Sequence, residues 1–381
     1  MPRKPKSFVL FRLLCPFLAI SAAAAEEIEI GPKEDWFAIL NGSDLRPGDT
    51  VILKEGVYTD SRRLSLRHRG TREAPITIRG EEGKRIVFQR PDARQNTFNL
   101  EGAEFLTIHA IEITGGSAAV RINHPENEKV RGITLNRMHI HHIGGVAVTC
   151  NHPGNTYEEM HFSANHIHHT KGHGEAFYLG GNNDAEGKTT TVFRNSIVEG
   201  NYIHHLDGPT VSQGDGIEVK DGSYGNVIRN NIIHDTKYPG ITIYGTDGKE
   251  RNVVEGNTIW NTGDHGIQVA AEALVRRNLI MRTGGDGIRS QDHQSARVGH
   301  LDILENTILK PRGFGIRLDL SEGASGPVLI RNNEIAAPQA FRVADEEQIS
   351  VQENRVSRLS SDTEVEQLQR EALSSWRNVR R

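Results

Sequence analysis

Residues 201–220 read NYIHHLDGPTVSQGDGIEVK, and residues 231–244 repeat the same design as NIIHDTKYPGITIY. Each segment begins with N-x-I and ends with a glycine, an isoleucine and alternating polar and β-branched residues. The pattern recurs at 257–270, 278–291 and 306–319. Its asparagine stands at positions 165, 201, 231, 257, 278, 306 and 333, at spacings of 21 to 36 residues. Constant segments at uneven spacing indicate stacked units joined by loops of variable length.

These segments predict strands, because polar and β-branched residues alternate with a period of two and show no helical period. A leucine-rich repeat would need a leucine consensus, which this sequence lacks. We therefore expect an all-β chain, a single-domain right-handed parallel β-helix over residues 26–357, with rungs about 4.8 Å apart.

Two residue types mark the turns of each predicted rung. We expect Asn201, Asn231, Asn257 and Asn278 to point inward as a ladder whose amides satisfy backbone groups of the turns. A glycine stands at the corner before each following strand, where we expect a left-handed backbone. These corner glycines are Gly216, Gly240, Gly266, Gly287 and Gly315.

A solenoid must cover both ends of its hydrophobic core. Residues 33–43, KEDWFAILNGS, predict a short amphipathic capping helix before the first rung. Residues 358–381 predict a C-terminal helix that begins with a capping box of Ser361 and Glu364 and docks on the last rung. Its apolar face is expected to consist of Val365, Leu368, Ala372 and Trp376.

Residues 1–25 have a basic start, an apolar stretch and small residues up to Ala25, which is typical of a secretory signal peptide. Arg12 interrupts the apolar stretch, and this disfavours a permanent membrane anchor. We therefore expect an exported protein, periplasmic or extracellular, with no stable membrane insertion after cleavage.

Composition limits the partners of the mature chain. Without Arg3, Lys4, Lys6 and Arg12, the 45 basic residues fall to 41 against 49 acidic ones, a net charge of −8. An acidic chain disfavours nucleic acid as a partner. Cys150 is the one cysteine after residue 25, so no intrachain disulfide is expected. We expect a monomer that is stabilised by its core.

Aligning the rungs places charged and aromatic residues on one outer face. Side chains alternate along a strand, so Glu218 and Lys220 point outward while Ile217 and Val219 point into the core. Neighbouring rungs then stack three pairs: Glu175 with Asp215, Tyr178 with Glu218, and Lys220 with Tyr244.

Ordinary solvation of an outer strand face would account for some of these charges. However, the stacked carboxylates of Glu175 and Asp215 repel each other unless a cation or a shared proton compensates. The tyrosines, beside the small residues Gly180 and Ala270, predict a groove with an aromatic wall. Such a groove is typical of carbohydrate sites.

Histidines form a second pattern. The segments IHHI, IHHT, IHHL and IHDT place His141, His168, His204 and His234 in one column, with His142, His169, His205 and Asp235 beside it. A transition-metal site needs three or four ligands that converge on one point at about 2.0–2.1 Å. A straight ladder does this poorly, so the pattern favours stacked structural histidines over a metal site.

Residues 173–182, HGEAFYLGGN, and 214–231, GDGIEVKDGSYGNVIRNN, resemble the site rungs of polysaccharide lyases of the alginate lyase and chondroitinase-B type. The segments RPGDTVILKEGVYTD and GTREAPITIRGEEGKRIVF are similar to the opening rungs of that family. The resemblance spans most of residues 45–260. It implies acidic Ca²⁺ ligands, then a catalytic lysine, then an arginine one rung later.

On this resemblance Lys220 takes the position of the catalytic lysine. Glu175, Asp215 and Glu218 lie at or beside the positions of the cation ligands. The sequence departs from the family at two places: the expected arginine is Tyr244, and one expected acidic ligand is Gln213.

The chemistry that suits these residues is removal of the C5 proton of a uronic acid. That step requires a positive charge to neutralise the adjacent carboxylate and a base on the sugar face. Loss of the C4 substituent then makes the protein a lyase, and reprotonation from the other face makes it an epimerase. Lys220 and Tyr244 are adjacent and are expected to supply base and acid. Either Arg289 or a metal ion on Glu175 and Asp215 would neutralise the carboxylate.

We therefore predict a carbon–oxygen lyase or uronate epimerase that acts on an acidic polysaccharide. The predicted catalytic residues are Lys220, Tyr244, His265 and Arg289; the substrate-binding residues are Tyr178, Glu218, Gln268 and Asp286; and the Ca²⁺ ligands are Glu175 and Asp215.

Two alternatives remain open. A glycoside hydrolase would use two carboxylates about 5–9.5 Å apart, for which Asp215 with Asp286 or Glu175 are candidates. A carbohydrate-binding or structural solenoid would use the same surface without a reaction.

Overall fold

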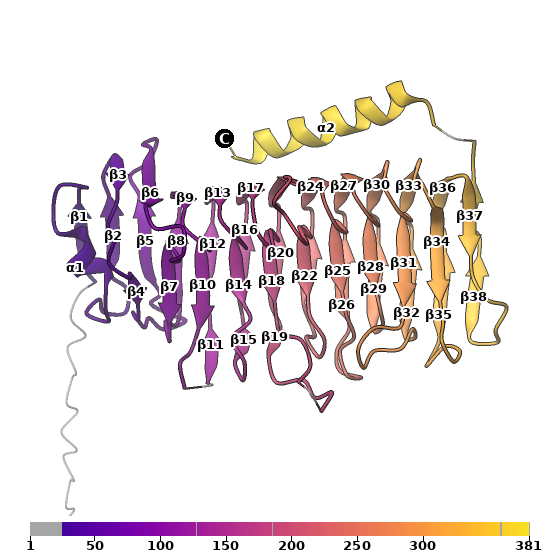
Figure 1. Cartoon of the computed structure of the whole chain (residues 1–381), viewed down its shortest axis with the longest axis horizontal. Coiled ribbons are helices and arrows are strands. Elements are labelled where there is room, and N and C mark those ends of the chain that lie inside the picture. Colours follow the sequence, from indigo (N-terminus) through magenta and orange to yellow (C-terminus); the bar gives the residue numbers. More distant parts are fainter. Residues whose placement is uncertain (1–24, 127, 185, 359, 381) are drawn as a thin grey trace, which may run out of the picture.

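The computed structural model describes residues 25–126, 128–184, 186–358 and 360–380. Its strands lie side by side along one long axis and form a solenoid (Figure 1). They make sheets of 13, 12 and 11 strands and a short sheet of three. The predicted all-β parallel β-helix is confirmed. Residues 1–24, nearly all of the predicted signal peptide, lie outside the described part of the chain.

The first sheet contains 13 strands. They are β1 (Glu27–Ile30), β2 (Thr50–Leu53), β5 (Ile76–Gly80), β8 (Leu106–His109), β12 (Thr134–Asn136), β16 (His161–Ser163), β20 (Ile197–Glu199), β23 (Val227–Arg229), β26 (Asn252–Glu255), β29 (Ala273–Arg276), β32 (Leu301–Leu304), β35 (Val328–Arg331) and β38 (Ile349–Gln352).

The second sheet contains 11 strands and carries the predicted site. They are β4 (Ser65–Leu66), β7 (Phe98–Glu101), β10 (Val120–Asn123), β14 (Val148–Cys150), β18 (Phe177–Leu179), β22 (Ile217–Val219), β25 (Ile241–Ile243), β28 (Ile267–Val269), β31 (Ile288–Gln291), β34 (Phe314–Asp319) and β37 (Gln339–Arg342).

The third sheet contains 12 strands and carries the histidine segments. They are β3 (Gly56–Tyr58), β6 (Ile86–Arg90), β9 (Glu112–Gly115), β13 (His139–Ile143), β17 (His166–Thr170), β21 (Tyr202–Leu206), β24 (Ile232–Thr236), β27 (Thr258–Thr262), β30 (Leu279–Met281), β33 (Thr307–Leu309), β36 (Glu334–Ala336) and β39 (Arg355–Val356). The short sheet joins β11 (Lys129–Arg131), β15 (Thr156–Glu158) and β19 (Val192–Arg194).

Each turn of the chain passes through the first, third and second sheets in that order, as β20, β21 and β22 do. Neighbouring rungs pair in parallel, so equivalent residues stack. Ile203, for example, pairs with Ile233 in the third sheet, and Ile217 with Ile241 in the second. The inward residues of all rungs form one continuous hydrophobic core.

The predicted asparagine ladder is confirmed inside the turns between the first and third sheets. The amide nitrogen Nδ2 of Asn201 donates to Oδ1 of Asn231 at 2.9 Å and to the carbonyl oxygen of Phe162 at 3.0 Å. The same pattern joins Asn231 to Asn257 at 3.0 Å, and it continues to Asn354, beyond the predicted members. Each amide thereby satisfies backbone groups that the turn leaves inside the core.

Glycine is required at the corners for a different reason from the one predicted. Gly216 does not adopt a left-handed backbone, whereas Gly214, two residues earlier, has φ of 79°. A Cβ atom on Gly216 would lie 2.4 Å from the carbonyl oxygen of Gly240 and 2.7 Å from Cγ2 of Ile233. Glycine is needed there because the stacked rungs leave no room for a side chain.

Two helices occur in the described residues, and they cover different parts of the solenoid. The short α1 (Trp36–Leu40) is the predicted N-terminal cap, with Trp36, Phe37 and Leu40 buried. The long α2 (Asp362–Arg380) begins at the predicted cap, where the Glu364 backbone N–H donates to Oγ of Ser361 at 3.2 Å. No helix of the described residues is long and apolar enough to cross a membrane.

The predicted docking of α2 on the last rung is wrong. The helix runs back along the solenoid and lies over the edge formed by the third sheet (Figure 1). Its predicted apolar face does make the contact, and Nε1 of Trp376 donates to the carbonyl oxygen of Gly200 at 3.0 Å. The reason is a row of outward hydrophobic residues on consecutive strands of the third sheet: Ile232, Trp260, Met281, Leu309 and Ala336.

Candidate active site

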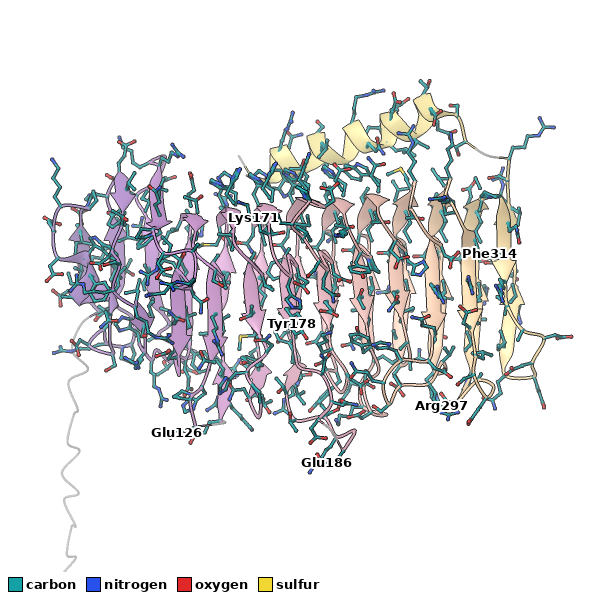
Figure 2. The ribbon with its side chains drawn as sticks, viewed as in Figure 1. Glu126, Lys171, Tyr178, Glu186, Arg297 and Phe314 are labelled. Carbon is teal, nitrogen blue, oxygen red and sulfur yellow. The ribbon has the colours of Figure 1, made fainter. Side chains whose placement is uncertain are left out.

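The predicted site residues lie on the outer side of the second sheet, in the predicted register. Tyr178 of β18 pairs with Glu218 of β22, and Glu218 pairs with Thr242 of β25. The same column continues through Gln268 of β28 to Arg289 of β31. Tyr178 lies near the middle of the solenoid (Figure 2).

Lys220 lies on the predicted outer side of the strand, but it does not face solvent. Lys220 keeps 6% of its surface exposed, and Asp215 and Glu218 keep 4% each. These side chains leave the strand on its outer side, but a layer of loops covers them. Alternation along a strand predicts which side of the sheet a residue faces, and it does not predict what lies above that side.

Two loops form the cover, and they meet above the ends of the strands. Residues 180–191 follow β18, and residues 292–298 follow β31. Nδ2 of Asn183 donates to Oδ2 of Asp221 at 2.8 Å and to Oγ of Ser295 at 3.2 Å. Nε2 of Gln294 donates to Oδ1 of Asn182 at 3.2 Å. Glu186 and Arg297 mark the two loops on the same edge of the molecule (Figure 2).

The predicted open groove is filled by the second of these loops. Ala270, which we expected to line the groove, packs with Ala271 against Ala296 and is buried. A Cβ atom on Gly180 would lie 2.6 Å from Oγ of Ser223. The space beside Gly180 and Ala270 is therefore occupied by neighbouring protein atoms. The cavities of about 620 Å³ beneath α2 and about 540 Å³ near Arg67 do not include Lys220.

Lys220 lies at the centre of a group that we call the lysine cluster: Tyr178, Glu218, Lys220 and Tyr244. Its ammonium Nζ donates to Oε1 of Glu218 at 2.5 Å. Nζ also lies 4.7 Å from the ring centre of Tyr178 and 4.9 Å from that of Tyr244. Burial lowers the pKa of Lys220, but the Glu218 charge and the contact with Tyr178 outweigh burial and raise the pKa above its ordinary value. Lys220 is therefore an ammonium ion at neutral pH.

Tyr244 shares the carboxylate with Lys220. Its hydroxyl donates to the same Oε1 of Glu218 at 3.1 Å. Burial and the charges of Glu218 and Asp215 raise the pKa of Tyr244 far above its ordinary value. The phenol therefore keeps its proton across the physiological pH range.

His293 completes this group, and the sequence did not reveal it. Its imidazole stacks on the ring of Tyr244 with 4.4 Å between ring centres. Burial lowers the pKa of His293, and the Lys220 charge lowers it further. The ring is therefore neutral at pH 7. His293 lies in the covering loop, outside the repeat, so that rung alignment gave no signal for it.

Glu175 and Asp215, which we call the acid pair, stack on adjacent rungs as predicted. Glu175 is 1% exposed, and its Oε2 has no hydrogen-bond partner among the described residues. Oδ1 of Asp215 accepts from the Thr242 hydroxyl at 2.6 Å. Burial, together with the Glu218 charge, raises the pKa of both members of the acid pair. The shift favours the protonated form of each acid, in which the two side chains do not repel each other.

The acid pair is a poor cage for Ca²⁺. Ca²⁺ takes six to eight oxygen ligands. In the described residues, the sets of three ligating side chains with donor atoms within 4.8 Å of one another all contain histidine, and none includes Glu175 or Asp215. Lys220 already supplies a positive charge beside Glu218.

The other predicted residues form a separate group. His265 and Gln268 lie one rung beyond Tyr244, and Asp286 and Arg289 lie two rungs beyond it. Nδ1 of His265 accepts from the Asp286 backbone N–H at 2.9 Å, and Nε2 lies 3.2 Å from both Oδ1 of Asp264 and Nη1 of Arg289. Asp286 accepts from the Phe314 backbone N–H at 2.7 Å. Arg289 pairs with Oδ2 of Asp319 at 2.8 Å.

In this arrangement both ring nitrogens of His265 already have partners, and one carboxylate oxygen of Asp286 accepts from the Phe314 backbone. The roles predicted for His265, Arg289, Gln268 and Asp286 stay predictions.

The comparisons place the fold among right-handed β-helices. A family model described as right handed beta helix region matches residues 147–335. A mannuronic acid specific polysaccharide family 6 lyase from human gut microbiota is 13% identical, with a TM-score of 0.61, over 91% of this chain and 94% of the lyase. None of the curated proteins matches the sequence.

Two other solved structures have the same fold. The A-module of a mannuronan C-5 epimerase from Azotobacter vinelandii is 13% identical, with a TM-score of 0.55, over 82% of this chain and 87% of the module. A GH136 lacto-N-biosidase from Eubacterium ramulus is 14% identical, with a TM-score of 0.61, over 88% of this chain and 68% of the biosidase. The chain is a right-handed parallel β-helix protein. Because these three similar structures have different activities, the fold does not select among their chemistries.

Proposed function

We propose that this β-helix protein acts on an acidic polysaccharide and removes the C5 proton of a uronic acid, as a lyase or a C5-epimerase. The names of two structurally similar proteins, a mannuronic acid specific lyase and a mannuronan C-5 epimerase, support a uronate polymer as the substrate class. The resemblance of residues 173–182 and 214–231 to lyase site rungs points the same way.

One observation carries the proposal: the ammonium of Lys220 and the hydroxyl of Tyr244 both donate to Oε1 of Glu218. Both donors are protonated at neutral pH, so we assign neither of them as the base. Lys220 and Tyr244 are buried in this structure, so the covering loops have to open for the polysaccharide. Lys220 then supplies the positive charge that neutralises the uronate carboxylate, and Tyr244 is the proton donor. We assign the neutral imidazole of His293, stacked on Tyr244, as the base.

The lyase step balances with these residues. His293 takes the C5 proton, and the electron pair of the C5–H bond forms the C4–C5 double bond. The C4–O bond breaks, and the leaving oxygen takes the proton of Tyr244. In an epimerase the carbanion at C5 is reprotonated from the opposite face instead.

The test is a screen of the mature protein against alginate, chondroitin and pectate. A lyase makes unsaturated uronate, which absorbs ultraviolet light; an epimerase changes the uronate stereochemistry seen by NMR. Reducing ends without unsaturation would favour the hydrolase, and retention without turnover would favour the binding solenoid. Either of these last two results would overturn the proposal.

Lys220→Arg separates the two roles for Lys220. A guanidinium keeps the positive charge but does not give up its proton in proteins. We expect Lys220→Arg to retain measurable turnover, whereas Lys220→Met should lose it. An inactive, folded Lys220→Arg protein would return Lys220 to the role of base.

Binding of Ca²⁺ to Glu175 and Asp215 stays a prediction, and no step above depends on it. If it occurs, added Ca²⁺ should raise the melting temperature and a chelator should lower it, because the ion binds the native state. No shift at saturating Ca²⁺ would leave protonation of the acid pair as the compensation.

We also propose that the protein is exported, because residues 1–25 have the pattern of a signal peptide. A mature N-terminus after Ala25, read from protein in the periplasm or the medium, would test this.

A further inference from the structure

The third sheet carries nine histidines on consecutive rungs, which we call the histidine array. They are His139, His141 and His142 of β13, His166, His168 and His169 of β17, His204 and His205 of β21, and His234 of β24. The predicted column is confirmed: the rings of His141 and His168 stack at 5.2 Å, those of His168 and His204 at 4.9 Å, and those of His204 and His234 at 5.2 Å.

Within a strand, adjacent histidines are in contact, as Nδ1 of His168 is with Nδ1 of His169 at 2.6 Å, whereas the contacts between ring nitrogens of neighbouring rungs run diagonally between columns. Nε2 of His139 lies 2.9 Å from Nε2 of His168, although the strand register pairs His168 with His141. One rung farther, Nε2 of His166 lies 2.8 Å from Nε2 of His204. A single straight column of histidines holds a metal ion poorly, because its ligands do not converge on one point. His139 and His166 form a second column, which makes convergence possible.

Two imidazole nitrogens at this separation share either one proton or one metal ion. His139, His166 and His168 each offer a ligand atom within 4.8 Å of those of the other two. All three side chains are partly exposed, so an ion can reach them. We propose that His139, His166 and His168 bind a divalent first-row transition metal of the Cu²⁺ or Zn²⁺ type, for which imidazole is a favoured ligand.

The three-histidine set is a better site than its neighbours. Two other sets meet the same distance limit, Glu112 with His139 and His141, and His205 with His234 and Asp235. In the first, Glu112 already accepts two hydrogen bonds from Arg85, at 2.8 and 2.7 Å. In the second, Oδ2 of Asp235 already pairs with Nδ1 of His234 at 2.7 Å. The three-histidine set contains no carboxylate that is already engaged in this way.

Each of the three ligand atoms lies within 4.8 Å of the other two, so metal binding must bring His166 to the ligand distance as well as adjust His139 and His168. Metal–nitrogen distances of about 2.0–2.1 Å at a tetrahedral angle separate two ligand nitrogens by about 3.3 Å. His139 and His168 must therefore move apart by roughly 0.4 Å. The ring of Trp376 in α2 lies 5.5 Å from the ring of His166, so the helix flanks the site. The site is on a different sheet from Lys220 and does not depend on the proposed function.

The test is a titration of the metal-free full chain with Cu²⁺, against a competing chelator, read by calorimetry and electron paramagnetic resonance. We expect stoichiometric binding and hyperfine coupling to several nitrogen nuclei. Cu²⁺ should displace bound Zn²⁺, because divalent copper binds nitrogen ligands more tightly than zinc, and Ca²⁺, which prefers oxygen ligands, should not compete with either ion. A Cu²⁺ spectrum without nitrogen coupling, or no stoichiometric binding, would overturn the proposal without reference to any variant.

The variant is His139→Gln/His168→Gln, in which the amides keep hydrogen-bonding capacity. Loss of even an outer-shell partner weakens metal binding by about 10–100-fold, so we expect at least that loss here. His161→Gln is the matched control, since His161 pairs with Glu199 on the first sheet and belongs to no such set. Equal Cu²⁺ affinity of the double variant and the control would contradict the assignment. Urea melts of both proteins check folding, and the spectrum of the unaltered chain stands if the double variant does not fold.

Discussion

Two outer faces of one solenoid stack titratable residues in columns, and they avoid repulsion in opposite chemical ways. On the second sheet, burial raises the pKa of Glu175 and Asp215, which favours the protonated, neutral form of these acids. On the third sheet, burial first and then neighbouring histidines lower the pKa of His168 to about 2 and that of His204 to about 3. A parallel register repeats each position on every rung. Such a column therefore admits ionisable groups in their neutral form, or beside a built-in counter-charge such as Lys220.

The largest expected effect comes from removing that counter-charge. Lys220→Ala leaves Glu218 buried without its ammonium partner, and breaking a buried ion pair in this way costs about 3–5 kcal/mol of unfolding free energy. Removal of a solvent-facing amine would instead cost at most about 1 kcal/mol. Urea denaturation at pH 7 measures the difference.

Lys171→Ala is the control, because Lys171 is exposed on the connection after β17 (Figure 2). It should change stability by less than about 0.5 kcal/mol. Similar midpoints for Lys220→Ala and Lys171→Ala would show that the lysine cluster opens to water.

The next effect concerns turnover. Tyr244→Phe deletes only the hydroxyl that donates to Glu218, so stability should fall by about 1 kcal/mol. If Tyr244 is the proton donor, turnover on the substrate found in the screen should fall at least about 10²-fold. Tyr238→Phe, at an exposed tyrosine, should keep full turnover. Full turnover of Tyr244→Phe would remove Tyr244 from the mechanism.

The sequence predicted what depends on periodicity and missed what depends on loops. Alternation and the asparagine spacing were sufficient for the rungs, the inward ladder and the pairing of Tyr178 with Glu218, because parallel stacking repeats one register. The burial of Lys220 and the position of His293 depend on residues 180–191 and 292–298. These two segments lie far apart in the sequence and have no repeat to align.

Two further misses share one cause, which is packing between distant segments. The path of α2 was set by the outward row that includes Trp260, and the amphipathic pattern of a helix does not indicate which surface it will cover. Gly216 was assigned a backbone role because the contact that excludes a side chain comes from Ile233, on the next rung. The local sequence around α2 and around Gly216 does not indicate either of these contacts.

A smaller effect is the difference in the pH dependence of stability between the residues of the second sheet and those of the third sheet. The folded-state pKa values of His168 and His204 lie below the ordinary value of 6.5, so their contribution to stability is present above pH 6.5 and is lost as pH falls toward about 3 and 2. Both rings are partly exposed, and after allowance for solvent screening each should cost about 1 kcal/mol at pH 5.

Urea midpoints at pH 8 and pH 5 measure this loss, and His168→Gln/His204→Gln should reduce it. The acid pair changes stability with pH in the opposite direction. Its raised folded pKa values give a contribution that is present at low pH and is lost as pH rises through them, so Asp215→Asn should reduce the loss on the alkaline side. The same acid sensitivity in the histidine variant and the unaltered chain would contradict this comparison.

The smallest effect separates adjacent residues of one strand. His168 stacks between two rings, so His168→Asn should cost about 1 kcal/mol of stability. His169 has φ of 54°, in the left-handed region where asparagine is one of the few favoured residues. Its hydrogen bond from ring to ring with His168, 2.6 Å long, is on the exposed side, and the asparagine amide can replace it. His169→Asn should therefore stay within about 0.5 kcal/mol of the unaltered chain. Equal losses for the two variants would mean that the backbone of the turn, and not the stacking of the rings, determines which residues the array accepts.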